Sequence, residues 1–218
     1  MPNGVDVEHH RPRPELRRQT RACLHIADEP LVVFVGAFYP WHDLETLLHA
    51  FRLILERDGR TKLLLVGDGD TRQRAEDLAR GLAVSDSTIF TGRVDHQNIP
   101  SLLSAADVAV APYPRSDVEF WGSPMKIYEY MACGCAIVAT SVGQLKQVIQ
   151  DGTNGILAPP GDPQALAAAI QRLLVNPPLR SRIGIQARND ALSEHSWDGY
   201  ALQLESVFEG IARTERKR

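Results

Sequence analysis

Residues 31–59 read LVVFVGAFYPWHDLETLLHAFRLILERDG, and this stretch decides the fold. Its first six residues form a short apolar run that is rich in β-branched side chains and ends at Gly36, which is typical of a buried strand. After a polar loop, apolar residues recur at helical spacing: Leu44, Leu47, Leu48, Phe51 and Leu55. Gly59 is a plausible stop for that helix. The stretch therefore predicts a strand, a loop and an amphipathic helix in succession.

The same alternation continues along the chain. Further strands are predicted at residues 62–67, 88–92, 108–113, 136–140 and 155–160. Helices are predicted at residues 70–82, 99–106 and 179–192, within residues 122–134, and in segments that begin at residues 163 and 197. This order predicts an α/β fold, namely a Rossmann-like parallel sheet with helices on both faces. Ligands bind such sheets at the carboxyl ends of the strands. The candidate site therefore lies in the loops after the strands, at residues 36–43, 67–72, 92–98 and 112–124.

Composition excludes several classes of protein. The chain has 218 residues, 44% hydrophobic residues and a formal net charge of -3, so nothing in its overall charge points to nucleic acid. Its three cysteines form no disulfide framework, and we expect a reducing, cytoplasmic location. No apolar run is long enough to span a bilayer, and the polar opening residues do not form a signal peptide. Peripheral association with a membrane surface stays open.

The segment GSPMKIYEYMACG, residues 122–134, places Gly-Ser-Pro directly before a predicted helix. Pro124 suits the first turn of a helix, and the free amides of Met125 and Lys126 would then point out of its start. A helix start attracts phosphate through its unpaired donors and its partial positive charge. Lys126 opposes the helix dipole there, which favours a bound anion.

Glu129 follows Lys126 by three residues, on about the same helix face. One interpretation is a surface ion pair of little energetic value. The other is that the carboxylate of Glu129 accepts hydrogen bonds from the vicinal hydroxyls of a sugar, while the helix start holds phosphates. A nucleotide requires both contacts, but periodicity alone favours the surface ion pair.

Seven segments, in order, carry a resemblance to a known family: PNGVD (residues 2–6), LLLVGDGD, IFTGRV, LLSAADVAVAPY, SPMKIYEYMACGCAIVAT, DGTNGILAPPGD and HSW. Together they resemble the C-terminal, donor-binding half of a family 4 glycosyltransferase of the glycosyl transferases group 1 family, which has the GT-B fold. The resemblance covers nearly the whole chain. It implies one half of a GT-B fold and a nucleotide-diphosphate sugar as donor substrate, with no further cofactor.

The resemblance also implies roles for individual residues. Glu129 would hold the ribose hydroxyls, and the backbone around Gly122, Ser123, Met125 and Lys126 would face the diphosphate and the sugar. Arg93 and Val94 would line the base pocket, and the loop from Gly36 to His42 would approach the phosphates from the other side. No cluster of His, Cys and Asp shows metal-ligand spacing, so the site is expected to be metal-independent. No catalytic residue can be assigned.

Three departures from the family pattern bear on the donor site. The family has a Glu eight positions before Glu129, where this chain has Trp121, and Glu119 either serves the sugar or is a solvated loop residue. Ala37 and His42 stand about where the family has a phosphate-binding Arg and Lys. His42 could still donate to a phosphate if protonated, and an anion would raise its pKa. The late Gly-x-x-Glu of the family is GQLKQV here.

These observations lead to a domain plan and to two functional hypotheses. Residues 1–30 are expected to be an N-terminal linker, residues 31–192 the nucleotide-sugar-binding domain, and residues 193–218 a C-terminal helix that packs on an N-terminal domain absent from this chain. The first hypothesis is a retaining glycosyltransferase half that transfers a hexosyl group to a glycan or other acceptor. It would be active only with an N-terminal partner, either a separate chain or a lost portion. The second is a non-catalytic nucleotide-binding or interaction module.

The resemblance further implies that the final helix crosses back to that N-terminal domain. In that case its apolar stripe would be partly exposed in the isolated chain, and the protein would tend to self-associate.

Overall fold

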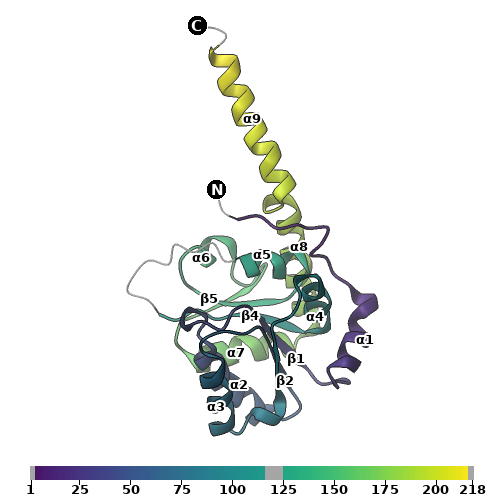
Figure 1. The fold of residues 1–218 in the computed structure, drawn as a ribbon, viewed down its shortest axis with the longest axis vertical. Coiled ribbons are helices and arrows are strands. Elements are labelled where there is room, and N and C mark those ends of the chain that lie inside the picture. Colours follow the sequence, from purple (N-terminus) through teal and green to yellow (C-terminus); the bar gives the residue numbers. More distant parts are fainter. Residues whose placement is uncertain (1–2, 116–124, 216–218) are drawn as a thin grey trace.

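The computed structural model describes residues 3–115 and 125–215, and the side chains of these as far as Phe208. Within these residues lies a six-stranded sheet of order β3-β2-β1-β4-β5-β6 in which every pairing is parallel (Figure 1). The strands are β1 (Leu31–Val35), β2 (Lys62–Val66), β3 (Thr88–Gly92), β4 (Val108–Ala111), β5 (Ile137–Thr140) and β6 (Ile156–Ala158). The order reverses between β1 and β4, which is the switch point where such sheets bind ligands.

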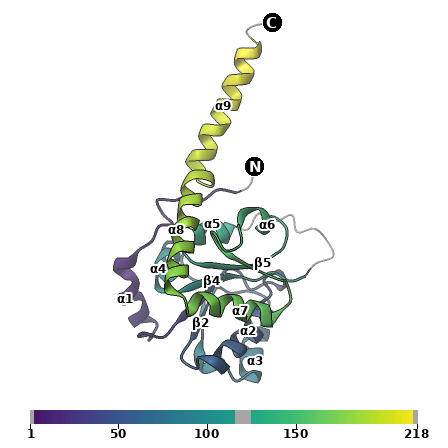
Figure 2. The ribbon, with the colours of Figure 1, turned by 180° about the vertical axis from the view of Figure 1, so that it is seen from behind.

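Helices cover both faces of the sheet (Figure 2). One face carries α2 (Leu44–Arg57), α3 (Arg72–Gly81) and α7 (Pro163–Leu174), and the other carries α4 (Ile99–Ala105) and α5 (Met125–Ala132). Alternate residues of β1 serve the two faces: Leu31, Val33 and Val35 pack with α4 and α5, while Val32 and Phe34 pack with α2 and α7. Helix α8 (Pro177–Glu194) contributes side chains to both cores.

The predicted Rossmann-like α/β class is confirmed, and all six predicted strands are present. The predicted start of α7 is confirmed too, because the side chain of Asp162 accepts a hydrogen bond from the Ala165 amide and Pro163 occupies the first turn. The structure adds α1 (Pro14–Cys23), α6 (Leu145–Val148) and the short 3-10 helices Pro40–His42, Ser85–Ser87 and His96–Asn98. Helix α1 lies within the segment that the sequence suggested was a linker.

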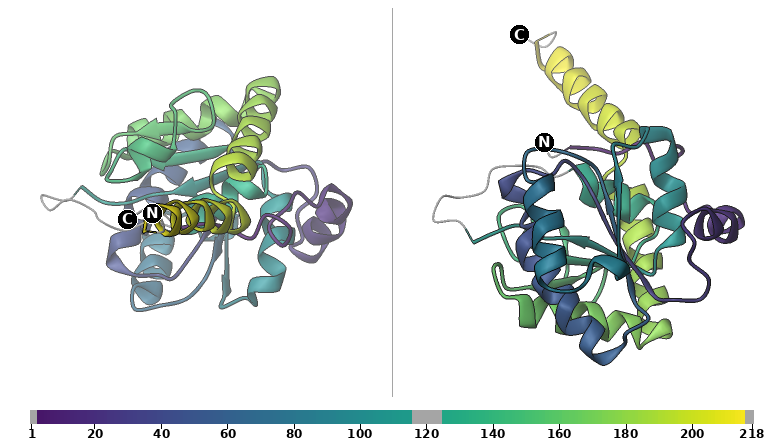
Figure 3. Two further views of the ribbon diagram at one scale, coloured as in Figure 1. Left: turned by 90° about the horizontal axis from the view of Figure 1, so that it is seen from above. Right: turned by 60° about the horizontal axis from the view of Figure 1, so that its bottom comes forward.

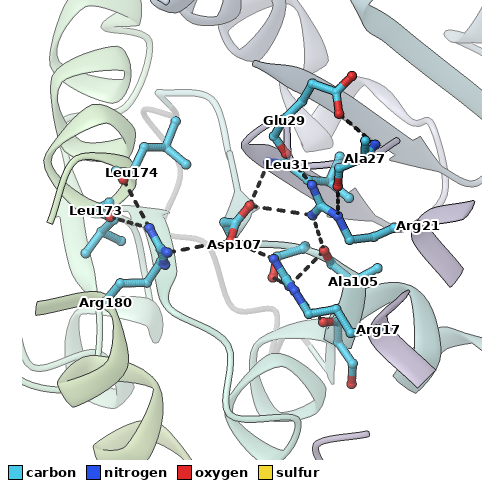
Figure 4. Close-up of polar contacts among 12 residues, drawn as sticks. Arg17, Arg21, Ala27, Glu29, Leu31, Ala105, Asp107, Leu173, Leu174 and Arg180 are labelled. Carbon is cyan, nitrogen blue, oxygen red and sulfur yellow. Dashed lines mark hydrogen bonds and ion pairs between the residues drawn. The ribbon is translucent and has the colours of Figure 1, made fainter. Parts of the chain in front are cut away.

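Helix α1 packs on α4 at the side of the domain (Figure 3). Figure 4 shows what anchors it: the carboxylate of Asp107, just before β4, lies among the guanidinium groups of Arg17, Arg21 and Arg180. Asp107 Oδ1 is 2.9 Å from Arg17 Nη2, and Asp107 Oδ2 accepts the amide hydrogen of Leu31 at 2.8 Å. The N-terminal segment is therefore tied to the amino ends of the central strands.

Helix α9 (Trp197–Glu215) projects away from the body of the domain (Figure 1). The Ser196 hydroxyl caps it by accepting the Gly199 amide hydrogen at 3.1 Å. Large apolar side chains along it are exposed: Trp197, Leu202, Leu204, Val207 and Phe208. Nowhere in residues 3–115 and 125–215 does a helix combine the length and apolar character needed to cross a bilayer.

Candidate functional site

A pocket of about 680 Å³ opens at the carboxyl ends of β1, β2 and β3. It is built from the loops after these strands and from one face of α5. Its lining comprises Val35, Gly36, Ala37, Tyr39, Val66, Gly67, Asp68, Gly69, Asp70, Arg93, Val94, His96, Ile99, Lys126 and Glu129. Three of the four loops singled out from the sequence thus meet in one place, at the end of the sheet where the fold predicts a ligand.

Glycines let two of these loops approach each other closely. Gly67 adopts a φ of 141°, and a Cβ at that position would lie 1.9 Å from the carbonyl oxygen of Gly36. The Gly36 amide donates to the Val66 carbonyl at 2.9 Å, and the Gly67 amide donates to the Gly92 carbonyl at 3.0 Å. Backbone atoms therefore form this part of the pocket wall. At Gly67 no side chain would separate a ligand from the backbone.

Lys126 contributes a buried cation to this pocket. Its side chain is 9% exposed, and its Nζ lies 4.3 Å from the centre of the Phe34 ring. A Cβ on Gly36 would lie 2.6 Å from that Nζ, so the ammonium points at the first loop. It has no hydrogen-bond partner among the described residues. Burial lowers the pKa of Lys126 to about 7, although the charge of Glu129 opposes that shift.

Glu129 is the carboxylate of the pocket and lies one turn of α5 beyond Lys126. Its side chain is 13% exposed, and its Oε1 is 3.2 Å from His96 Nε2 and 3.9 Å from His10 Nε2. Burial lowers the pKa of His10, so that imidazole is neutral at pH 7. Because a carboxylate has about four acceptor sites, Glu129 can accept hydrogen bonds from a pair of hydroxyls in addition to its contact with His96.

The structure brings together five of the residues that the sequence analysis proposed for the site: Gly36, Arg93, Val94, Lys126 and Glu129. Met125 is half exposed and does not line the pocket. Gly122, Ser123 and Glu119 lie outside the described residues, as does Trp121.

His42 lies behind the pocket wall. Its Nδ1 donates to the Ala37 carbonyl at 2.5 Å, and its ring contacts Phe34 and Tyr113 at centroid distances of 5.7 and 5.5 Å. Burial, with the charge of Lys126, lowers the pKa of His42 to about 4. In the protein alone this imidazole is therefore neutral at pH 7 and offers no charge to a phosphate.

Four residues in or beside the pocket were not named individually from the sequence. His96 and Tyr39 lie in two of the loops that the sequence singled out, but a lone loop residue carries no signal of its own. His9 and His10 come from the N-terminal segment and meet His96 across 87 and 86 positions of sequence. Only the packing of that segment against α5 and α8 brings these three imidazoles together.

A second hollow of about 840 Å³ lies beside α1, lined in part by Arg17, Arg21 and Asp107. It is at the amino ends of the strands, since Asp107 directly precedes β4. Its guanidinium groups are already bonded to Asp107 and to backbone carbonyls. These hydrogen bonds and ion pairs stabilise the N-terminal segment, and they leave the guanidinium groups of neither Arg17 nor Arg21 unpaired for a ligand.

Comparison with known proteins places this geometry in context. Phosphatidyl-myo-inositol mannosyltransferase of Mycobacterium leprae is 32% identical over 218 residues, which is 100% of this chain and 54% of the relative. Among solved structures, sucrose-phosphate synthase from Thermosynechococcus elongatus superposes with a TM-score of 0.84 at 30% identity, over 98% of this chain and 52% of that one. Anabaena HepE, solved with UDP and glucose, has the same fold (TM-score 0.84, 21% identity, 95% of this chain and 55% of that one).

This chain thus spans about half the length of these similar proteins. The family model described as "Glycosyl transferases group 1" matches residues 29–176, which include every strand of the sheet and both charged side chains of the pocket on α5. The chain belongs to the glycosyl transferases group 1 family.

Proposed function

We propose that this chain is the donor-binding half of a retaining GT-B glycosyltransferase that transfers a hexosyl group from a nucleotide-diphosphate sugar. The observation that carries the proposal is the pairing of a buried ammonium with a carboxylate in one pocket. Lys126 Nζ lies at the Gly36 loop, and Glu129 lies one helical turn away beside His96. A nucleotide offers an anionic diphosphate and a ribose diol, which these two groups would bind.

The pocket gives each part of the donor a place. The diphosphate would lie between Lys126 and the loop that begins at Gly36. The buried ammonium of Lys126 has no hydrogen-bond partner among the described residues, which favours an anion there. The ribose hydroxyls would donate to Glu129. The base would lie near Arg93 and Val94 after β3.

Acceptor binding and turnover require surfaces that this chain does not supply. In our proposal a separate N-terminal domain closes the cleft, excludes water and orients a glycan or other acceptor. The exposed apolar side chains of α9 are the natural place for that domain to pack, since exposed patches of this kind mark contact surfaces. We place the protein in the cytoplasm, with peripheral contact to a membrane where the acceptor is lipid-linked.

A second candidate is a nucleotide-binding module without transferase activity. Trp121 in place of a carboxylate and Ala37 in place of a cation favour it. Assays for glycosyl transfer with and without a candidate N-terminal domain separate the two. Nucleotide binding without transfer in any combination would support the module and end the transferase proposal.

Replacing Glu129 by glutamine is expected to weaken nucleotide affinity by about tenfold to hundredfold, because hydrogen bonds to a charged acceptor are worth about 1.5–3 kcal/mol. Calorimetric titration of the chain with UDP, GDP and ADP measures this and identifies the base. Glu15→Gln, on an exposed carboxylate of α1, is the matched control and should bind as the parent does. If Glu129→Gln binds the preferred nucleotide as tightly as the parent, the assignment of Glu129 to the ribose is wrong.

Nucleotide binding at pH 8 is expected to draw up to about one proton into the protein. Lys126 has a pKa of about 7, so its amine is mostly neutral at pH 8, and a diphosphate beside it raises that pKa and favours the ammonium. The diphosphate is already fully ionised at pH 8, since phosphate groups of this kind have a pKa of about 6. Calorimetry in buffers of different ionisation enthalpy measures the proton uptake.

The control for the proton measurement is Lys126→Met, which keeps an apolar stem in the same space. It should bind nucleotide more weakly and without proton uptake. Uptake that persists in Lys126→Met would assign the proton to another group. His42 is a poor source of it, because its pKa of about 4 would have to rise by about four units.

A further inference from the structure

A cluster of three histidines lies beside the donor pocket and has no role in the function proposed above. His9, His10 and His96 each present one ring nitrogen such that these atoms all lie within 4.8 Å of one another. The ring centroids are 4.7 Å apart for His9 and His10, and 4.9 Å apart for His10 and His96. Imidazole nitrogens are the commonest protein ligands of metal ions, so three of them at this range could share one ion.

His10 supplies an independent sign that the cluster holds a ligand. Its side chain is 3% exposed, yet neither ring nitrogen has a hydrogen-bond partner among the described residues. An imidazole always carries at least one N–H or lone pair that needs a partner, and a buried polar atom without one costs roughly 1–3 kcal/mol. The nearest anionic atom, Glu129 Oε1, is 3.9 Å from His10 Nε2, which is too far for a hydrogen bond. A ligand at the centre of the cluster would remove this cost.

The backbone under the cluster is already fixed. Asp6 Oδ1 accepts the amide hydrogens of Glu8 and His9 at 3.0 and 2.9 Å, and the His10 amide donates to the Asp6 carbonyl at 2.9 Å. Arg188 of α8 then donates to the His10 carbonyl at 2.8 Å and to the Ala132 carbonyl at the end of α5 at 2.7 Å. The backbone of both adjacent histidines is therefore fixed beside the end of α5. The side chain of His96 is 61% exposed, and its Nε2 lies 3.2 Å from Glu129 Oε1.

We propose that His9, His10 and His96, with Glu129 as the fourth ligand, form a binding site for a divalent transition metal of the Zn²⁺ class. Three imidazoles and one carboxylate are the donor set that Zn²⁺ accepts in four-coordinate sites. Ligand atoms of a tetrahedral Zn²⁺ lie about 3.4 Å apart, given bond lengths of about 2.0–2.1 Å. The ligand atoms of the three histidines already lie within 4.8 Å of one another, so a bound metal would draw them closer, and the exposed side chain of His96 leaves room for that movement.

The site shares Glu129 with the ribose, so it would regulate the same pocket. This consequence, unlike the metal site itself, rests on the proposed function. A metal that takes Glu129 as a ligand removes the acceptor of the ribose hydroxyls, and nucleotide removes the fourth ligand of the metal. The two ligands are therefore expected to oppose each other, each weakening the affinity of the other by the same factor.

The first test is titration of the full chain with Zn²⁺ by calorimetry, and with Co²⁺ by its visible absorption, in the absence of nucleotide. One metal per chain is expected, with the intense absorption of four-coordinate Co²⁺. His96→Ala removes an exposed ligand without disturbing the core and should weaken Zn²⁺ affinity by about tenfold or more. His10→Ala should do the same. His49→Ala, on α2 and outside the cluster, keeps the same histidine count as these variants and should bind metal as the parent does.

Metal affinity that is unchanged in His96→Ala, or no stoichiometric binding in the parent chain, overturns the site. Because this readout involves no nucleotide, it does not depend on whether the donor proposal holds. Nucleotide titration of the Zn²⁺-loaded and metal-free chain then tests the sharing of Glu129. Weaker nucleotide binding to the loaded chain supports it, and equal affinity in the two forms overturns it. Absence of nucleotide binding to the metal-free chain contradicts the donor proposal alone.

Discussion

Replacing Asp107 by asparagine is expected to lower the free energy of unfolding by about 3–5 kcal/mol, which is the usual cost of breaking a buried ion pair from one side. The Asp107 carboxylate is 12% exposed, and its nearest cations are Arg17 at 2.9 Å and Arg21 and Arg180 at 3.7 Å (Figure 4). Asparagine keeps the shape and can still accept the Leu31 amide hydrogen. It cannot balance the guanidinium of Arg21, which is only 8% exposed.

Chemical denaturation of Asp107→Asn beside the parent chain measures this loss. Glu56→Gln is the matched control, because it removes a carboxylate from the Arg52 pair on α2, where both side chains are about half exposed. An exposed pair of this kind is worth about 0–1 kcal/mol. A loss below about 1 kcal/mol in Asp107→Asn would show that the backbone carbonyls bonded to Arg17 and Arg21 are sufficient to hold the N-terminal segment.

The effect should be confined to stability. Asp107 lies at the amino ends of the strands, whereas the pocket proposed for the donor lies at their carboxyl ends. The folded fraction of Asp107→Asn should therefore bind nucleotide with the affinity of the parent. Lower stability with unchanged nucleotide affinity would show that the ion pairs that hold α1 act independently of the groups proposed to bind the donor.

Much of the fold follows from local pattern. The run at residues 31–35 is apolar on both alternating faces, as a central parallel strand requires. The runs of β2 and β4 repeat this pattern, and each precedes a loop and a helix. The pattern missed α1, because its stability comes from guanidinium contacts to a carboxylate and carbonyls about 85–90 residues away. No periodicity within residues 14–23 reports such contacts.

The candidate site was predictable only in part, because local sequence pattern does not report contacts between distant residues. Position after the strands and on α5 indicated where the site lies, and the family resemblance singled out Gly36, Arg93, Lys126 and Glu129, which do line one pocket. The sequence suggested Lys126 as a charge in a helix start, and its burial over Phe34 depends on how β1 packs against α5. His10 is likewise close to Glu129 only through tertiary packing of the N-terminal segment.

Replacing Gly67 by alanine is expected to destabilise the chain by about 2–4 kcal/mol and to abolish measurable nucleotide binding. The new methyl group would lie 1.9 Å from the Gly36 carbonyl oxygen, so one of the two loops must move. Its φ of 141° adds strain, because side chains other than glycine rarely adopt it. The atom in the way is backbone, which cannot rotate aside as the end of a flexible side chain could.

Gly81→Ala provides the matched control for this change. Gly81 is the last residue of α3, it is exposed, and a Cβ there would meet nothing within 4 Å. Alanine at that position should leave stability unchanged or raise it by up to about 1 kcal/mol, since it restricts the unfolded chain. Both variants are compared by denaturation and by nucleotide titration.

The direction of loop movement decides the functional outcome of Gly67→Ala. If the Gly36 loop yields, its position relative to Lys126 Nζ changes, because the two are adjacent: a Cβ on Gly36 would lie 2.6 Å from that atom. The space proposed for the diphosphate is then distorted, and we expect binding to fail even where the protein stays folded. A folded Gly67→Ala chain that binds nucleotide with the affinity of the parent would place the diphosphate away from this pair of loops. In that case a bound phosphate would not explain why the ammonium of Lys126 is buried without a hydrogen-bond partner among the described residues.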